Sequence, residues 1–151
     1  MRSFYPISLI AVLTACSGPS HLELQGTDSP VDSAAAQTEL VHVQGRFTGV
    51  VPTGKRHQSF IFTFHVEAVL HGAPTDTDIR FELYQDFGGR DLIAALSGQT
   101  PMSGLDLVAA ARSVTGSTPY QLVLRMFPVR QIHTPNWVNA QLITSPQALR
   151  P

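Results

Sequence analysis

Histidine and cysteine are the side chains of this sequence best suited to hold a metal, and they are few. The chain of 151 residues has six histidines and one cysteine, Cys16. His65 and Glu67 stand two residues apart in a segment that alternates apolar and polar residues, so both would lie on one face of a strand. With a third ligand they could chelate a metal ion. An ion pair between Glu67 and Arg46 explains the same patch, and we expect no metal site.

No group of residues has the spacing of a known catalytic motif. The sequence lacks G-x-S-x-G, H-E-x-x-H, a glycine-rich phosphate loop and a CxxC pair. Asp86-Phe87-Gly88 spells the magnesium-binding motif of protein kinases, but no other kinase signature accompanies it. We interpret it as a Gly88-Gly89 turn between strands. The sequence therefore predicts a protein that is not an enzyme and uses no cofactor.

The sole cysteine follows a short apolar segment. Arg2 supplies one positive charge, residues 7–15 are mostly apolar, and the small residue Ala15 precedes Cys16. These features are typical of a secretory signal peptide. The apolar run is much shorter than the roughly 20 residues that a membrane-spanning helix needs.

Leu13-Thr14-Ala15-Cys16 resembles the lipobox of bacterial lipoproteins. The resemblance implies that residues 1–15 are removed and that the thiol of Cys16 carries lipid, which anchors the protein to a membrane. Ser17 stands where an aspartate usually retains such proteins in the inner membrane, so the resemblance implies an outer-membrane protein that faces the periplasm. An ordinary signal peptide with an incidental cysteine is the alternative. Lipidation would leave no thiol for disulfides or catalysis.

Charge is distributed unevenly along the chain. The formal net charge is −1, which does not indicate nucleic-acid binding. Residues 17–45 contain four acids and no lysine or arginine, whereas the chain after Asp106 contains four arginines and no acid. The acidic stretch has little to bury, so we interpret residues 16–39 as a lipidated N-terminus and flexible tether. The basic half is either a partner-facing patch or a set of scattered solubilising arginines.

From residue 40 onward, apolar and polar residues alternate in the pattern of half-buried strands. Apolar residues take odd positions in residues 41–51 and even positions in residues 60–70. If these two strands pair with both apolar faces inward, Arg46 lies opposite His65 and Gln44 opposite Glu67, with Arg46 diagonal to Glu67. Further strands are expected at residues 79–83, 120–126 and 138–142.

Two segments, residues 90–96 and 103–114, fit either a helix or a strand. One-sided alternation argues against a parallel α/β sheet. About six or seven short strands predict an all-β fold, a small antiparallel β-sandwich or a small barrel. The domain would span residues 40–145, and residues 146–151 would form a C-terminal tail.

The segment between the last two expected strands is the candidate binding surface. We expect a loop over residues 128–137, and aromatic residues and arginine are enriched where proteins bind partners. Trp137 falls out of phase with the apolar residues that follow it, so it would face outward; a tryptophan tucked under the end of the sandwich is the alternative. The candidate partner-binding residues are Phe127, Arg130, His133 and Trp137.

The predicted layout is similar to that of small outer-membrane lipoproteins of secretion systems. Val43-Gln44-Gly45-Arg46-Phe47 resembles the opening of the β-sandwich pilotins of type III secretion, and residues 79–85 with Trp137 resemble the transthyretin-like lipoprotein of the type VI membrane complex. The resemblance implies an assembly factor that binds an envelope protein, such as a secretin or a secretion-complex subunit. We expect no helical insertion, which favours the pilotin. A lipid-anchored small-ligand carrier or enzyme, with polar groups inside an apolar pocket, is a further alternative.

Overall fold

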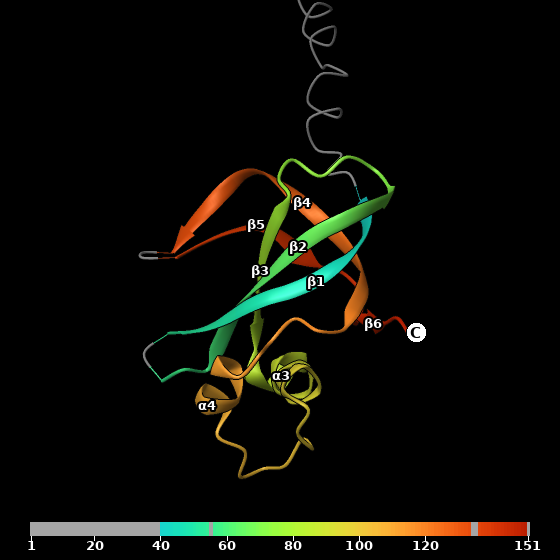
Figure 1. Ribbon diagram of the computed structural model, residues 1–151. Helices are drawn as coiled ribbons and strands as arrows, with labels where there is room; N and C mark the ends of the chain where they lie inside the picture. Colours follow the sequence, from blue (N-terminus) through green and yellow to red (C-terminus); the bar gives the residue numbers. More distant parts are fainter. Residues whose placement is uncertain (1–39, 55, 134–135, 151) are drawn as a thin grey trace, which may run out of the picture. The chain divides into compact units, whose positions relative to one another are not determined.

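The expected small antiparallel all-β fold is confirmed. The computed structural model describes residues 40–150 apart from residues 55 and 134–135, so the predicted signal peptide, Cys16 and the predicted tether lie outside the described residues (Figure 1). Within these described residues, one sheet of six strands is accompanied by a π-helical turn and two helices. In chain order the elements are β1 (Leu40–Thr53), β2 (Ser59–His71), β3 (Asp78–Tyr84), η1 (Gln85–Gly89), α3 (Arg90–Ser97), α4 (Leu107–Arg112), β4 (Pro119–His133), β5 (Asn136–Leu142) and β6 (Gln147–Ala148).

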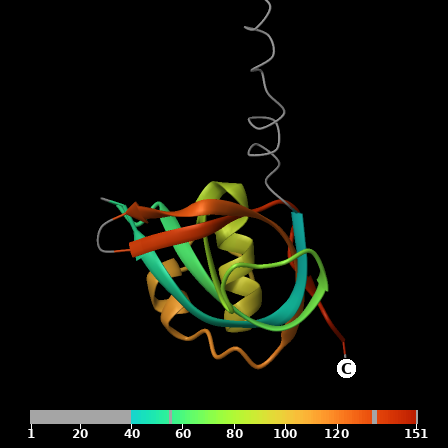
Figure 2. The same ribbon diagram turned by 90° about the horizontal axis from the view of Figure 1, so that it is seen from above.

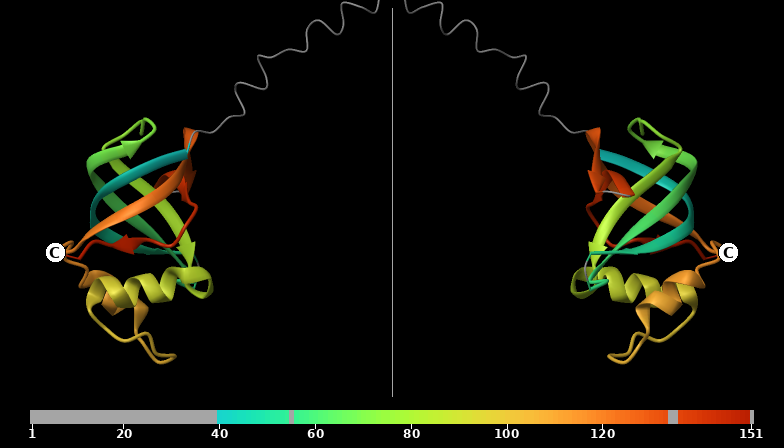
Figure 3. Two further views of the ribbon diagram at one scale, coloured as in Figure 1. Left: turned by 90° about the vertical axis from the view of Figure 1, so that its right-hand side faces the viewer. Right: turned by 90° about the vertical axis from the view of Figure 1, so that its left-hand side faces the viewer.

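The sheet curls around its own interior. Its strand order is β3-β2-β1-β4-β5. The short strand β6 lies in residues 146–151, which were expected to form a tail, and it pairs with β4. Seen along the interior, the strands surround it and α3 lies across the far end (Figure 2). Both helices gather at this one end of the sheet (Figure 3). The edge strands β3 and β5 approach each other, and the side chain of Asn139 hydrogen-bonds to the backbone of β3.

The core consists of the inward faces of the strands, closed at one end by the helices. The ring of Phe47 lies edge-on to four other aromatic rings, with centroid distances between 5.1 and 6.2 Å. Such contacts add about 0.5–1.5 kcal/mol per pair to the burial of apolar area. The two helices contribute further buried side chains. The central members of the core are Phe47, Phe60, Phe62, Phe64, Phe81, Leu122, Leu124, Leu92, Ile93 and Leu107.

The pairing of β1 with β2 is confirmed at its centre and shifts at its ends. Arg46 lies opposite His65, and the Nε of Arg46 is 2.9 Å from Glu67 Oε1, as the alternation predicts. The expected pairing of Gln44 with Glu67 is wrong, because the register shifts between Gln44 and Gly45 and places Gln44 opposite Ala68. A Cβ at Gly45 would overlap the carbonyl oxygen of His65, so the shift depends on glycine.

Another of the three register shifts between β1 and β2, the one between Phe47 and Gly49, reverses which side chains face the core. The odd-position pattern places Val51 inside, but Val50 is the buried residue, with 7% of its surface exposed, and Val51 is 40% exposed. A bulge inserts one residue and so changes the phase of the alternation beyond it. The expected burial of residues 68 and 70 is also wrong, because β2 continues past the end of its pairing with β3 at His65.

The two ambiguous segments are both helical. Helix α3 ends at Gly98, which has a φ of 71° and supplies the left-handed residue that stops a helix. Helix α4 begins after Asp106, whose carboxylate accepts hydrogen bonds from the backbone N–H groups of Val108 and Ala109. The Gly88-Gly89 turn therefore leads from β3 into a helix and not into a strand. The expectation that the domain has no helical insertion is wrong.

Candidate partner-binding surface

The last long hairpin carries most of the candidate binding residues. The expected loop over residues 128–137 is wrong, because β4 continues to His133 and β5 begins at Asn136. Beyond Arg125, which pairs with Leu40, β4 no longer pairs with β1. The part of the β4–β5 hairpin formed by residues 126–133 and 136–140 is called the hairpin arm below.

A wide bulge interrupts the hairpin arm. Met126 pairs with Ala140 and Gln131 pairs with Val138, so residues 127–130 of β4 lie opposite Asn139 alone. Pro128 lies within this bulge, where its missing N–H costs no ladder hydrogen bond. Bulges redirect side chains. Here the bulge leaves Val129 74% exposed and turns Arg130 toward Asp76 and Trp137.

Two arginines contact the ring of Trp137. The guanidinium carbon of Arg130 lies 4.2 Å from the ring centroid, and that of Arg80 lies 4.7 Å from it. Arg130 Nη2 also donates to Asp76 Oδ1 at 2.8 Å, and Asn139 Nδ2 donates to Asp76 Oδ2 at 2.9 Å. Cation–π contacts of this kind contribute about 0.5–2 kcal/mol each. We call the five residues Asp76, Arg80, Arg130, Trp137 and Asn139 the Arg–Trp cluster.

The Arg–Trp cluster has an excess of positive charge. The hydrogen bonds from Asn139 and Arg130 lower the pKa of Asp76, so this carboxylate is ionised and offsets one arginine. Burial lowers the pKa of Arg80, and the Nε of Arg80 is buried without a hydrogen-bond partner among the described residues. No described carboxylate forms an ion pair with Arg80. The Nη2 of Arg80 donates to Asn136 Oδ1 at 3.3 Å, so among the described residues the guanidinium is bonded to an amide and not to a carboxylate.

The four candidate residues have different surroundings. Arg130 and Trp137 are in contact, and Trp137 is half-buried, between the outward and the tucked positions considered from sequence. Phe127 is half-buried and lines a separate recess of about 350 Å³ with Glu82 and Gln131. His133 pairs through its backbone with Asn136, and its side chain lies outside the described residues.

Three members of the Arg–Trp cluster were not predicted from the sequence, namely Asp76, Arg80 and Asn139. Each lies on a polar position of a strand or in a connection, where a solvent-exposed role is the ordinary interpretation. Their meeting depends on the approach of β3 to β5, and the hydrogen bonds that join them span 54 to 63 residues of sequence. Asn139 stands between the apolar residues Val138 and Ala140, as ordinary strand alternation would place it, so its burial had no signal in the sequence.

The hairpin arm also exposes large apolar side chains. Ile132 lies opposite Trp137 in the hairpin and is 77% exposed, and Val129 is exposed to a similar extent. Exposed apolar residues that gather beside aromatic and arginine side chains mark protein-binding surfaces more often than single exposed residues do. The surface thus combines apolar area, one aromatic ring and net positive charge.

The side chains of the histidine patch on β2 already have partners, one in an ion pair and one in a hydrogen bond. Glu67 is bound to Arg46, and the Nδ1 of His65 lies 2.8 Å from Asp78 Oδ1. Among the described residues, no three histidine, cysteine, aspartate or glutamate side chains are grouped so that they could hold a metal ion. No described helix has the length and hydropathy needed to cross a membrane.

The connectivity defines a class of fold. In the described part of the chain, a curled antiparallel sheet with the order β3-β2-β1-β4-β5 and the helices α3 and α4 between β3 and β4 forms a small barrel-like domain. This class hosts many unrelated functions, so it identifies an architecture alone. No protein-family model matches the chain, and no curated protein or solved structure is significantly similar to it.

Proposed function

We propose that the protein is a lipid-anchored lipoprotein of the outer membrane that binds another envelope protein through its hairpin arm and Arg–Trp cluster. The anchor is inferred from the lipobox-like segment that ends at Cys16. The binding role rests on one observation above others: Ile132 is exposed opposite a tryptophan that two arginines contact, and Val129, in the same hairpin arm, is exposed as well. A solitary folded domain gains nothing from exposing these apolar side chains, whereas a partner would bury them.

The partner we propose is a component of a protein secretion system. Both the pilotin-type role and the role of a type VI membrane-complex lipoprotein remain candidates. The pilotin is favoured over the type VI lipoprotein only if the domain has no helical insertion. Because helices α3 and α4 lie between β3 and β4, this preference no longer holds. Arg80, which forms no ion pair with a described carboxylate, favours a partner that brings a carboxylate to the cluster.

Two experiments test the two halves of the proposal. For the anchor, cells producing the wild-type chain or Cys16→Ala are labelled with a clickable palmitate analogue and fractionated. Label and outer-membrane retention are expected for the wild-type chain only. A Cys16→Ala chain that stays in the outer membrane with equal label would overturn the lipid anchor.

For the binding role, a photo-crosslinking amino acid replaces Ile132 in cells, and Thr48, an exposed residue of β1, serves as the matched control position. We expect one envelope protein to be crosslinked from position 132 and not from position 48, with the yield reduced by Arg80→Gln. Equal crosslinking from both positions, or none from position 132, would refute the binding role of the hairpin arm.

A further inference from the structure

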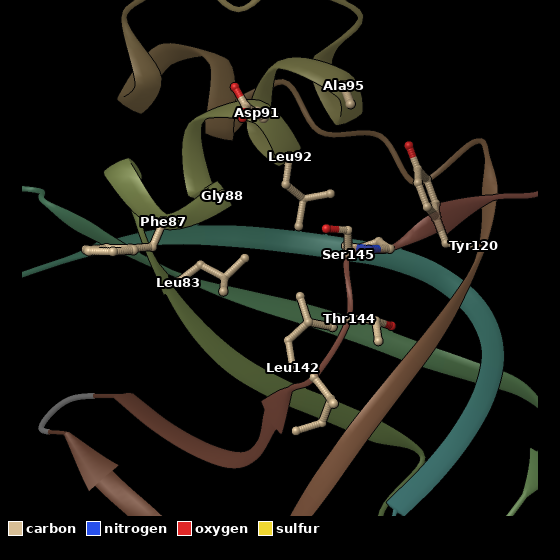
Figure 4. A pocket seen from close by; sticks show the side chains of 12 residues that line it. Leu83, Phe87, Gly88, Asp91, Leu92, Ala95, Tyr120, Leu142, Thr144 and Ser145 are labelled. Atoms are coloured by element: carbon tan, nitrogen blue, oxygen red, sulfur yellow. The ribbon is translucent and has the colours of Figure 1, made fainter.

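A second recess lies at the helical end of the domain and shares no residue with the Arg–Trp cluster. It has a volume of about 390 Å³ and lies between α3 and the segment that follows β5 (Figure 4). Leu83, Leu92, Tyr120 and Leu142 are among the apolar residues of its wall. Leu92 and Tyr120 are themselves buried, so the wall is continuous with the core and rigid.

One rim of the recess carries an exposed aromatic ring. Phe87 lies at this rim and is 79% exposed. It belongs to the π-helical turn η1, in which Gly88 has a φ of 89°. A Cβ at Gly89 would lie 2.7 Å from the carbonyl oxygen of Tyr84. Two consecutive positions of the turn therefore require glycine, and the turn they form holds a large apolar side chain in solvent.

The charge around this recess is negative. Asp91 lines it, and no lysine, arginine or histidine does. No described residue forms an ion pair with Asp91, whereas nearby Asp86 is 4.0 Å from Arg90. The local field therefore favours a cation beside an apolar group.

The volume restricts what can enter. Pockets that take a whole small ligand measure about 300–1,000 Å³, and this recess lies at the lower end of that range. It suits one or two side chains and is too small for a helix laid along it. We propose that the recess binds a large apolar side chain of a partner protein, aromatic or branched, whose neighbour in sequence is a lysine or an arginine.

The test uses the full chain carrying Cys16→Ser, labelled with ¹⁵N and observed by amide NMR. Three acetylated, amidated peptides are added: Gly-Arg-Phe-Arg-Gly, Gly-Glu-Phe-Glu-Gly and Gly-Arg-Ala-Arg-Gly. We expect the first to shift the amides of residues 87–95 and 142–145 in a saturable way. The other two should bind at least about tenfold more weakly, because each lacks one of the two features that the recess recognises.

Two variants separate binding in the recess from adsorption elsewhere. Ala95→Trp places a large ring at the recess from an exposed helical position and should abolish the shifts, whereas Ala109→Trp on the exposed face of α4 should leave them unchanged. Asp91→Asn should bring the arginine and glutamate peptides to within about threefold of each other.

Three results would overturn the proposal. These are equal binding of the arginine and glutamate peptides to the wild-type chain, undiminished binding to Ala95→Trp, and saturable binding of decanoate in preference to the first peptide. The last result would instead assign the recess to a fatty-acid carrier. None of them bears on the hairpin arm, which the crosslinking at Ile132 tests separately.

Discussion

The side-chain amide of Asn139, on β5, makes the hydrogen bonds to the edge of β3 that a neighbouring strand would make. Its Oδ1 accepts a hydrogen bond from the backbone N–H of Arg80 at 2.8 Å. Its Nδ2 donates to the carbonyl oxygen of Asp78 at 3.3 Å and to Asp76 Oδ2 at 2.9 Å. One buried side chain thus satisfies backbone groups of a neighbouring strand that the sheet itself leaves unpaired.

We therefore predict that Asn139→Leu lowers the free energy of unfolding by about 2–4 kcal/mol. The substitution keeps the volume but leaves a buried N–H, a carbonyl and a carboxylate short of partners, and each unsatisfied group costs about 1–3 kcal/mol. Urea unfolding measures the effect. Gln141→Leu, at the exposed next polar position of β5, is the control and should change stability by less than about 0.5 kcal/mol. If the two substitutions lower the stability equally, the hydrogen bonds of Asn139 do not stabilise the junction of β3 and β5.

The pKa of Asp76 predicts a dependence of stability on pH. The hydrogen bonds from Asn139 and Arg130 lower this pKa below its ordinary value of 3.8. A lowered folded pKa means that the carboxylate stabilises the fold above the unfolded value and that this stabilisation is lost as the pH falls through the folded value. The wild-type chain should therefore exceed Asp76→Asn in stability at pH 7, and the difference should shrink below about pH 4. If the difference in stability between the wild-type chain and Asp76→Asn does not change with pH, the negative charge of Asp76 does not contribute to stability.

Trp137 offers a direct optical test, because it is the sole tryptophan of the chain. Arg130→Ala removes the guanidinium 4.2 Å from the ring centroid and should expose the ring to water. We expect the emission maximum to move to longer wavelength and iodide quenching to increase. Arg125→Ala, at another exposed position of β4, is the control. An unchanged spectrum in Arg130→Ala would mean that the two side chains are not stacked in solution.

Neighbouring valines test the bulge in β1. Val50→Asp places a charge in the core and should prevent folding, whereas Val51→Asp lies on the exposed side and should fold with nearly normal stability. Circular dichroism and protease resistance distinguish the outcomes. The simple alternation of the sequence predicts the reverse result, so the pair decides between the two registers.

The strands were predictable because alternation reports directly on which face is buried. The phenylalanines at even positions from Phe60 to Phe64 and the apolar residues from Leu122 to Met126 are buried as expected. The bulges were not predictable, since one inserted residue changes the phase without any change in composition. Val50 and Val51 are chemically identical, and pairing with β2 alone decides which of them is buried.

The short helices and the Arg–Trp cluster were hidden for different reasons. Helix α4 has six residues, and in so short a segment the spacing of apolar residues does not distinguish a helix from a strand. The clearest sequence signal of this helix is its capping residue, Asp106. The Arg–Trp cluster depends on closure between strands distant in sequence. Local patterns could nominate Arg130 and Trp137 but could not supply Arg80 or Asp76.

The central position of β1 has a mechanical consequence if the protein is anchored through Cys16, as proposed above. Any pull between a membrane anchor and a bound partner enters the domain at Leu40, the first residue of β1. This strand is bonded to β2 along one side and to β4 along the other, by hydrogen bonds that run across the strand direction. Tension along β1 would strain many of these bonds together in shear rather than opening them one at a time. With the proposed anchor, β1 is thus the strand best placed to transmit force without unfolding.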